Sequence, residues 1–302
     1  MTQSIKLNAT MSLSDMGGAA GTVRAFAQAV EGLGYDGLGV PDHVLGANVA
    51  SRPDWGARNT SADLFHDPFV LFGFLSACTT RLEFSTQVLI LAQRQTALVA
   101  KQAASLAVLS EGRLRLGVGV GWNPVEFEGL NEDFSNRGRR SQEQVEVMRA
   151  LWAQPHVDVS GKWHRINDAG INPRPPGGHI PLWFGGHADA TLRRIALWGD
   201  GWIMLEHPPS QAALDAFERL RGYVRDAGRD SAEVGLEVWT SVGEGDEDSW
   251  RRDFQFWKDA GVTHITLNNA FGRYSHKRMP GRTVDDHIAA TTRYWNAVSD
   301  LR

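Results

Sequence analysis

The stretch RLRLGVGVGW occupies residues 113–122 and decides the fold. Its apolar residues recur at every second position from Leu114 to Val120, which is typical of a buried β-strand. Glycines alternate with them at 117, 119 and 121, so one face of the strand's end carries no side chain. A bare backbone lets a flat ring-shaped ligand lie against the chain, but glycine also relieves crowding in a tightly curved sheet. Both interpretations are open here. The dinucleotide fingerprint G-x-G-x-x-G fails, because its last glycine would fall on Trp122 or Pro124.

Short apolar strands alternate with amphipathic helical segments along the chain. The sequence predicts strands at Ile5–Ala9, Gly37–Val40, Leu82–Ile90, Leu114–Val120, Pro181–Gly185, Gly201–Leu205, Val234–Val242 and His264–Asn268. A helix is predicted after each strand, at Thr22–Leu33, Pro68–Cys78, Ala97–Leu109, Arg140–Trp152, Ala190–Trp198, Ala212–Ala227, Asp248–Ala260 and Val284–Val298. Eight such repeats predict an α/β fold, a (β/α)8 TIM barrel formed as a single domain over residues 1–302. A doubly wound open sheet is the alternative.

Composition narrows the function classes. The formal net charge of −4 gives no basic excess, so we expect no nucleic-acid partner. Cys78 is the only cysteine, which suits a reducing compartment. No stretch resembles a signal peptide or a bilayer-spanning segment, so we expect a cytoplasmic protein without membrane contact. The ten histidines form no H-x-H or H-E-x-x-H pair, and no metal site is predicted. A serine hydrolase is disfavoured because G-x-S-x-G is missing.

Two connections are too long to be simple turns. The first runs from about Val44 to His66, and we expect it to be a loop insertion over the C-terminal mouth of the barrel. The second runs from about Gln154 to Ile180, and its segment HVDVSGKWH (156–164) predicts a hairpin. Long ordered loops of this kind usually serve function.

In a TIM barrel the chemistry comes from residues at the C-terminal ends of the strands. Among these residues, His43 and His207 are the types that can exchange a proton near neutral pH, and a loop histidine bonded to backbone is the alternative for each. Gly185-Gly186 ends an apolar strand just before a helix. Free backbone N–H groups at such a helix start bind anions, so we expect a phosphate there; a plain strand-to-helix turn is the alternative.

Four segments together resemble the bacterial luciferase-like monooxygenase superfamily, and within it the branch that uses the deazaflavin coenzyme F420. They are GYDGLGVPDH (34–43), LEFSTQVLIL (82–91), AKQAASLAVLSEGRLRLGVGVGWNPVEF (100–127) and IPLWFGGHADATLRRIALWGDGW (180–202). The resemblance covers most of the chain up to about residue 205, and beyond that only the strand-helix rhythm matches. Sugar-phosphate dehydrogenases of this superfamily carry an acid where this chain has Trp122, which favours an apolar substrate.

The resemblance implies roles for residues at the mouth. Asp42 and His43 would lie beside the cofactor ring, with His43 as proton donor and Asp42 contacting the ring or setting the tautomer of His43. Gln87 and Val88 would form a bulge backing the ring, often with a non-prolyl cis peptide between them, and Thr86 would also contact the cofactor. Further contacts would come from Gly119, Gly121, Trp122 and Asn123 at the ring's edge, from Gly185, Gly186 and His187 at the cofactor phosphate, and from Trp55, Trp122, Trp183 and His207 at the substrate.

These features predict a coenzyme F420-dependent oxidoreductase that transfers a hydride to or from a small apolar substrate, with the deazaflavin as cofactor. The alternative enzyme is a monooxygenase that uses reduced FMN and dioxygen. A non-catalytic flavin-binding barrel is the alternative from another class, disfavoured by His43 and the long first loop. The resemblance also implies a homodimer. The sequence does not identify the substrate.

Overall fold

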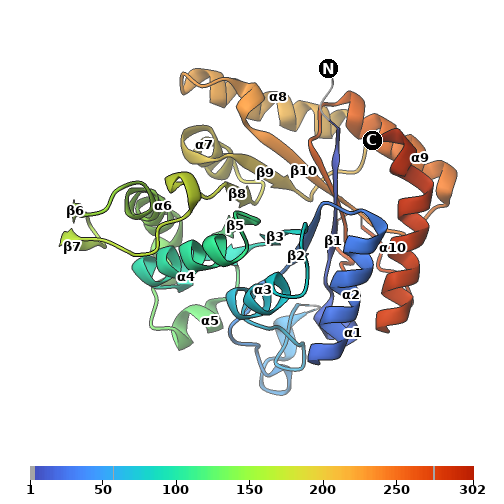
Figure 1. Cartoon of the computed structure of the whole chain (residues 1–302), viewed down its shortest axis with the longest axis horizontal. Helices are drawn as coiled ribbons and strands as arrows, with labels where there is room; N and C mark the ends of the chain where they lie inside the picture. The colour runs from blue at the N-terminus through green and yellow to red at the C-terminus, as the bar shows by residue number, and fades with distance from the viewer. Residues whose placement is uncertain (1–3, 57, 275) are drawn as a thin grey trace.

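Eight strand positions close into a parallel barrel surrounded by helices (Figure 1). The computed structural model describes residues 4–56, 58–274 and 276–302. The sheet order is β3-β2-β1-β11-β10-β9-β8-β5-β4, and pairing of β3 with β5 closes it. The barrel strands are β1 Lys6–Thr10, β2 Gly37–Val40, β3 Glu83–Thr86, β4 Leu89–Ile90, β5 Leu114–Gly119, β8 Leu182–Gly185, β9 Gly201–Met204, β10 Gly235–Thr240 and β11 His264–Leu267. The predicted TIM barrel is confirmed, and the open sheet is wrong.

A helix follows each strand position close to its predicted bounds. These helices are α2 Ala20–Leu33, α3 Pro68–Ser76, α4 Thr96–Leu109, α6 Arg137–Ala153, α7 Asp189–Trp198, α8 Gln211–Asp226, α9 Glu247–Asp259 and α10 Val284–Val298. The sequence pattern did not predict two short helices, α1 Leu13–Met16 and α5 Pro124–Gly129. The 3-10 turns are η1 Val49–Ser51, η2 Pro53–Trp55, η3 Leu91–Gln93, η4 Phe134–Asn136, η5 Pro176–Gly178, η6 Ser231–Glu233 and η7 Ser299–Leu301. The apolar outer faces of the strands pack against the helices and form the main core.

The third strand position is interrupted where a continuous strand over Leu82–Ile90 was predicted. β3 ends at Thr86, β4 begins at Leu89, and the Gln87–Val88 peptide between them is cis, as the resemblance implied. The interruption pushes Val88 toward its neighbours on β5 and β8. A Cβ at Gly119 would lie 2.5 Å from Val88 Cγ2, and a Cβ at Gly185 would lie 3.0 Å from Val88 Cγ1.

Crowding therefore accounts for glycines of the 113–122 stretch. A Cβ at Gly117 would lie 2.0 Å from the carbonyl oxygen of Thr86, and one at Gly121 would lie 2.6 Å from Ile90 Cγ2. Gly121 also has a φ of +75°, a conformation that favours glycine. Relief of crowding, the second of the two interpretations, is thus realised along the whole glycine run.

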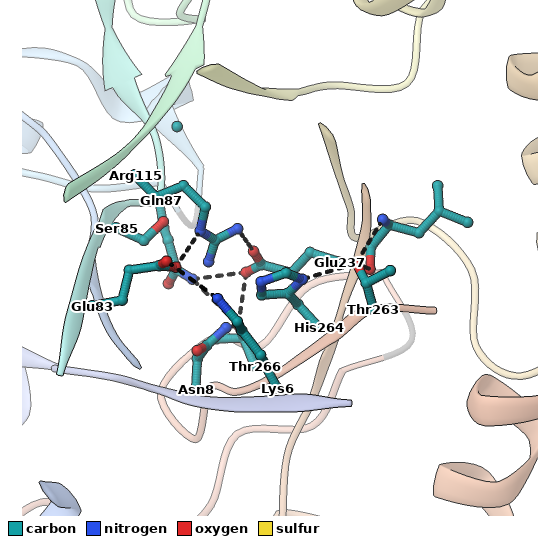
Figure 2. Close-up of polar contacts among 12 residues, drawn as sticks. Lys6, Asn8, Glu83, Ser85, Gln87, Arg115, Glu237, Thr263, His264 and Thr266 are labelled. Atoms are coloured by element: carbon teal, nitrogen blue, oxygen red, sulfur yellow. Dashed lines mark hydrogen bonds and ion pairs between the residues drawn. The ribbon is translucent and has the colours of Figure 1, made fainter. Parts of the chain in front are cut away.

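The barrel interior below the bulge is polar (Figure 2). Arg115 of β5 donates from Nε to Glu83 at 2.9 Å and forms a second ion pair with Glu237 of β10. Glu237 Oε1 accepts hydrogen bonds from Gln87 Nε2 at 2.9 Å and from Thr266 Oγ1 at 2.7 Å. Arg115 and Glu237 are both fully buried, so this network joins the barrel floor to the bulge through hydrogen bonds rather than apolar contacts.

The two long connections have different positions. Residues 44–56 and 58–66 contain η1 and η2 and lie over the mouth, where Trp55 contacts Trp122 just before α5. In the second connection β6 (Val157–Ser160) and β7 (Arg165–Ala169) form the predicted antiparallel hairpin. This hairpin lies at the edge of the molecule beside α6 (Figure 1). No helix in the described residues is long and apolar enough to cross a bilayer.

Candidate active site

A histidine–glutamate pair lies at the mouth between β2 and β5. His43 follows β2 by three residues, and Glu126 lies in the first turn of α5, which begins just after β5. His43 Nδ1 lies 3.3 Å from both carboxylate oxygens of Glu126. Pro124 at the start of α5 and the Asn123 side chain, which accepts a hydrogen bond from Val125 N at 3.0 Å, fix this short helix.

The Glu126 carboxylate is fully buried, yet it stays ionised. Burial alone would raise its pKa, but hydrogen bonds from His43, Gln93 and backbone N–H groups outweigh this effect and lower the pKa. Val44 N donates to Oε1 at 2.8 Å, and Leu45 N donates to the same oxygen at 3.2 Å. An ionised acceptor makes Nδ1 of His43 the protonated nitrogen. Nε2 is then available for proton exchange, and it has no hydrogen-bond partner among the described residues.

Asp42 does not set the tautomer of His43, and this expectation is corrected. Its carboxylate is buried and faces Arg94, whose Nη2 donates to Oδ1 at 2.7 Å. Ile90 N also donates to Oδ2 of Asp42 at 3.1 Å. Arg94 reaches Asp67 with its Nη1 at 3.0 Å. Asp42 and His43 are neighbours in the chain, but their side chains point in different directions. Asp42 bonds to Arg94 and Ile90 at the end of β2, whereas His43 bonds to Glu126.

Aromatic rings surround His43. The His43 ring lies 4.8 Å from the ring of Phe65 and 5.8 Å from that of Trp122. Trp122 in turn lies 5.7 Å from Trp55, and the Arg58 guanidinium lies 5.3 Å from the Trp122 ring centre. Trp55 and Trp122 therefore come together at the mouth. They give the His43 side of the mouth a largely apolar wall.

The bulge residues point in two directions. Thr86 is buried and donates to the carbonyl of Gly117 at 2.6 Å, so its side chain is taken up by the sheet. Gln87 points into the barrel interior, where Oε1 accepts from Thr10 Oγ1 at 2.8 Å. Val88 is half-buried and is the bulge side chain that contacts the apolar clusters near the mouth. Of the predicted cofactor contacts Thr86, Gln87 and Val88, Val88 alone presents its side chain where a ring could lie.

A narrow pocket lies between the ends of β5 and β8 and the helices α6 and α7. Its lining residues are Leu91, Val118, Gly119, Val120, Ser141, Val145, Phe184, Gly185, Thr191 and Arg194. Burial lowers the pKa of Arg194, and its guanidinium has no hydrogen bond or ion pair with the described residues. A Cβ at Gly138 would lie 2.6 Å from Arg194 Nη2, so glycine leaves room for this side chain.

The glycine pair after β8 borders this pocket. Gly186 has a φ of +113°, and its carbonyl accepts a hydrogen bond from Trp202 Nε1 at 2.8 Å, which fixes the turn. Thr191 comes from the first turn of α7, so the positive end of that helix faces the pocket, and Ser141 reaches it from α6. The position predicted for a phosphate therefore adjoins a pocket with an unpaired arginine, which sequence reasoning missed.

His187 and His207 lie in a separate groove between α7 and α8, lined also by Trp202, Glu206 and Arg219. His187 Nδ1 lies 3.7 Å from Glu206 Oε2, and burial lowers the pKa of His187. His207 Nε2 lies 3.9 Å from the same oxygen. The two histidines thus share one groove, and neither is among the residues that surround His43.

Two further predicted contacts are corrected. Trp183 lies over Arg115, at 4.3 Å from the guanidinium carbon to the ring centre, and lies 4.6 Å from the ring of His264. A Cβ at Gly201 or Gly235, where β9 and β10 begin, would strike the indole of Trp183. Trp183 therefore points toward the N-terminal end of the barrel and not toward a substrate at the mouth. Asn123 is buried and caps α5, so its side-chain oxygen is occupied within the chain.

Comparison with known proteins adds to this geometry. An uncharacterized protein of Mycobacterium tuberculosis is 38% identical over 182 residues, which span 59% of this chain and 62% of that protein. The F420-dependent glucose-6-phosphate dehydrogenase of Mycobacterium avium is 35% identical over 146 residues, or 46% of this chain and 43% of that enzyme. A solved F420-dependent secondary alcohol dehydrogenase has the same fold, with a TM-score of 0.78 at 17% identity, covering 99% of this chain and 100% of that one.

The model of one family, described as luciferase-like monooxygenase, matches residues 5–294. That range includes every barrel strand, the bulge at Gln87–Val88 and the His43–Glu126 pair. The chain belongs to the luciferase-like monooxygenase family.

Proposed function

We propose that this protein is a coenzyme F420-dependent oxidoreductase that transfers a hydride between the deazaflavin and a small, largely apolar organic substrate. The observation that carries the proposal is the His43–Glu126 pair, held at the barrel mouth with Nε2 of His43 unpartnered among the described residues. Similarity to the F420-dependent dehydrogenase of Mycobacterium avium supports the choice of deazaflavin. Trp122, Trp55 and Phe65 beside His43 support an apolar substrate.

The chain supplies the proton half of this reaction. When bound, the deazaflavin accepts or supplies the hydride. His43 Nε2 takes the proton that leaves a substrate hydroxyl on oxidation, and returns it to the oxygen when a carbonyl is reduced. The ionised Glu126 fixes Nδ1–H of His43 and stabilises the imidazolium, so the ring keeps its orientation in both protonation states. The aromatic wall around His43 limits access of water to this proton.

The residues present fit a phosphate-bearing cofactor. The pocket offers the Arg194 guanidinium, the Ser141 and Thr191 hydroxyls and the first turn of α7, all suited to an anion. A phosphate would give Arg194 the negative partner that the described residues do not provide. The pocket adjoins Val88 through Gly119 and Gly185, so one molecule with a ring and a phosphate could use both places.

An FMN-dependent monooxygenase that uses dioxygen is the second candidate. The family description favours it, and FMN also carries a ring and a phosphate. The pocket suits both cofactors equally, so the discrimination has to come from binding. Purified protein should be titrated with F420 and with FMN, with binding followed by the change in cofactor fluorescence. We expect F420 to bind more tightly, and tight FMN binding without measurable F420 binding would reverse the two candidates.

The phosphate site has its own control in the same titration. Arg194→Gln should weaken FMN about tenfold or more, because a charge-assisted hydrogen bond to the phosphate is lost. Riboflavin has the same ring without the phosphate, so its affinity should not change. An equal loss for FMN and riboflavin would mean that the variant disturbs the ring site, and an unchanged FMN affinity would remove Arg194 from the cofactor site.

A further inference from the structure

A buried indole N–H at the mouth has no partner. Trp239 is the last but one residue of β10, it is 7% exposed, and its Nε1 has no hydrogen-bond acceptor among the described residues. Its ring belongs to an interior cluster with Trp183 and Ile203, against which Val88, Leu205 and Phe271 pack. The Val88 side chain, in the bulge, lies where we place the cofactor ring. Trp239 therefore lies next to that place.

Further aromatic rings stand around Trp239 on the β9–β11 side of the mouth. The ring of Phe271 lies 5.2 Å from that of Trp239 and nearly perpendicular to it, at 87°. His276 and Tyr274 follow in the same loop, with ring centres 5.9 and 6.3 Å from that of Phe271. His187 from the β8 end lies 5.6 Å from Tyr274. A nonpolar flat molecule could pack well against such a wall.

The loop that carries this wall is fixed to neighbouring strands. Asn268 Oδ1 accepts from Phe271 N at 3.1 Å, which orders the turn after β11. Asn269 Oδ1 accepts from Val242 N at 3.0 Å and ties the loop to the end of β10. His276 Nε2 lies 3.2 Å from the carbonyl oxygen of Leu205 after β9. The loop is therefore positioned by polar contacts, whereas the Trp239 N–H has no acceptor among the described residues.

A buried donor without an acceptor costs free energy, and a native site that keeps one usually has a use for it. We infer that Trp239 Nε1–H donates to an oxygen of the substrate, and that the substrate is an apolar molecule of about one aromatic ring carrying an oxygen acceptor. The molecule lies beside the cofactor ring, with its oxygen toward Trp239 and its apolar part against the wall of Phe271, Tyr274 and His276. This inference rests on the proposed function only in taking the molecule that binds there as the hydride partner.

The test uses two probes that differ only in the acceptor. Acetophenone carries a carbonyl oxygen, and α-methylstyrene has the same shape with a CH₂ group in that place. Calorimetric titration of the protein, with and without bound cofactor, gives the ratio of their dissociation constants. We expect acetophenone to bind about tenfold or more tightly than α-methylstyrene in the wild type, and this ratio to fall to about one in Trp239→Phe.

Trp183→Phe is the matched control, because it removes the other indole of the same cluster and leaves Trp239 in place. This control should keep the wild-type ratio. If Trp239→Phe does not fold, replacement of Trp239 by benzothienylalanine removes the N–H and keeps the ring shape. A ratio that survives the loss of the N–H overturns the inference, as does a wild type that fails to discriminate or to bind either probe. Discrimination by a protein that binds neither F420 nor FMN would refute the proposed function alone.

Discussion

Glu126 and Glu237 are both fully buried glutamates, and they differ in what they face. Glu237 faces Arg115 in the barrel floor, a partner that keeps its charge at every accessible pH. Glu126 faces the imidazole of His43 at the mouth, whose Nε2 has no hydrogen-bond partner among the described residues. Backbone N–H groups also hold Glu126, so its carboxylate stays stabilised in both states of the histidine. We therefore assign Glu237 a role in the stability of the barrel, and we propose that Glu126 acts in the reaction by holding and stabilising His43.

The largest effect is expected from loss of the His43 imidazole at the mouth. His43→Ala should slow turnover by about 10²–10⁴-fold if the imidazole transfers a proton in the rate-limiting step. Thermal stability should change little, because Glu126 keeps its backbone donors and Gln93. Steady-state kinetics and cofactor titration on the same variant give the rate and the affinity. A rate that survives at saturating cofactor would leave His43 with a pocket-shaping role, and full activity would end the catalytic assignment.

A substitution in the barrel floor should lower stability. Glu237→Ala leaves the fully buried Arg115 with Glu83 alone, and breaking such a pair costs about 3–5 kcal/mol of unfolding free energy. Urea denaturation measures this loss. Glu237→Gln keeps an acceptor for Gln87 and Thr266 and should lose less. If Glu237→Ala unfolds at the wild-type urea concentration, the distinction between floor and mouth is wrong.

A smaller effect is expected from the mouth glutamate. Glu126→Gln removes the charge that stabilises the imidazolium, so kcat should fall by about ten- to a hundredfold, less than for the loss of the imidazole itself. Its KM for cofactor should stay near the wild-type value, which a general unfolding of the site would not allow. Comparison of kcat with KM over pH 6–9 provides the check.

Unfolding of the wild type and Glu126→Gln at acid pH tests the charge assigned to Glu126. The pKa of Glu126 is lowered in the folded protein, so its stabilising effect is complete above the ordinary glutamate pKa and is lost as pH falls through the folded value. Below about pH 4.5 the wild type should therefore lose more stability than Glu126→Gln does. Parallel melting curves of the two proteins at decreasing pH would contradict the assigned charge.

Features set by local sequence could be predicted. The period of two in residues 114–120 and the amphipathic helices specify the strand-helix repeats, because each element depends mainly on its own residues. The same holds for the hairpin of β6 and β7. His43 could be placed at the mouth because it follows a strand end. Trp55 and Trp122 could be placed there for similar reasons, one in a long loop and one after β5.

Partners distant in sequence could not be predicted in this way. Glu126 meets His43 across 83 positions, and Asp42 seemed the natural partner only because it is the neighbour in the chain. The signal was available in NPVEF (123–127), where an asparagine cap and a proline start a helix directly after a strand end. Trp183 was misplaced because the alternation of a strand gives the face of a side chain and not its depth along the barrel.

The contact of Val88 with two glycines on other strands limits how this mouth can change. A Cβ at Gly119 would lie 2.5 Å from Val88 Cγ2, and one at Gly185 would lie 3.0 Å from Val88 Cγ1. Alanine at 119 and valine at 88 thus exclude one another, and alanine becomes acceptable at 119 only after position 88 has lost its branched side chain. Substitutions at these three positions are therefore epistatic, and libraries that reshape the mouth need to vary them together.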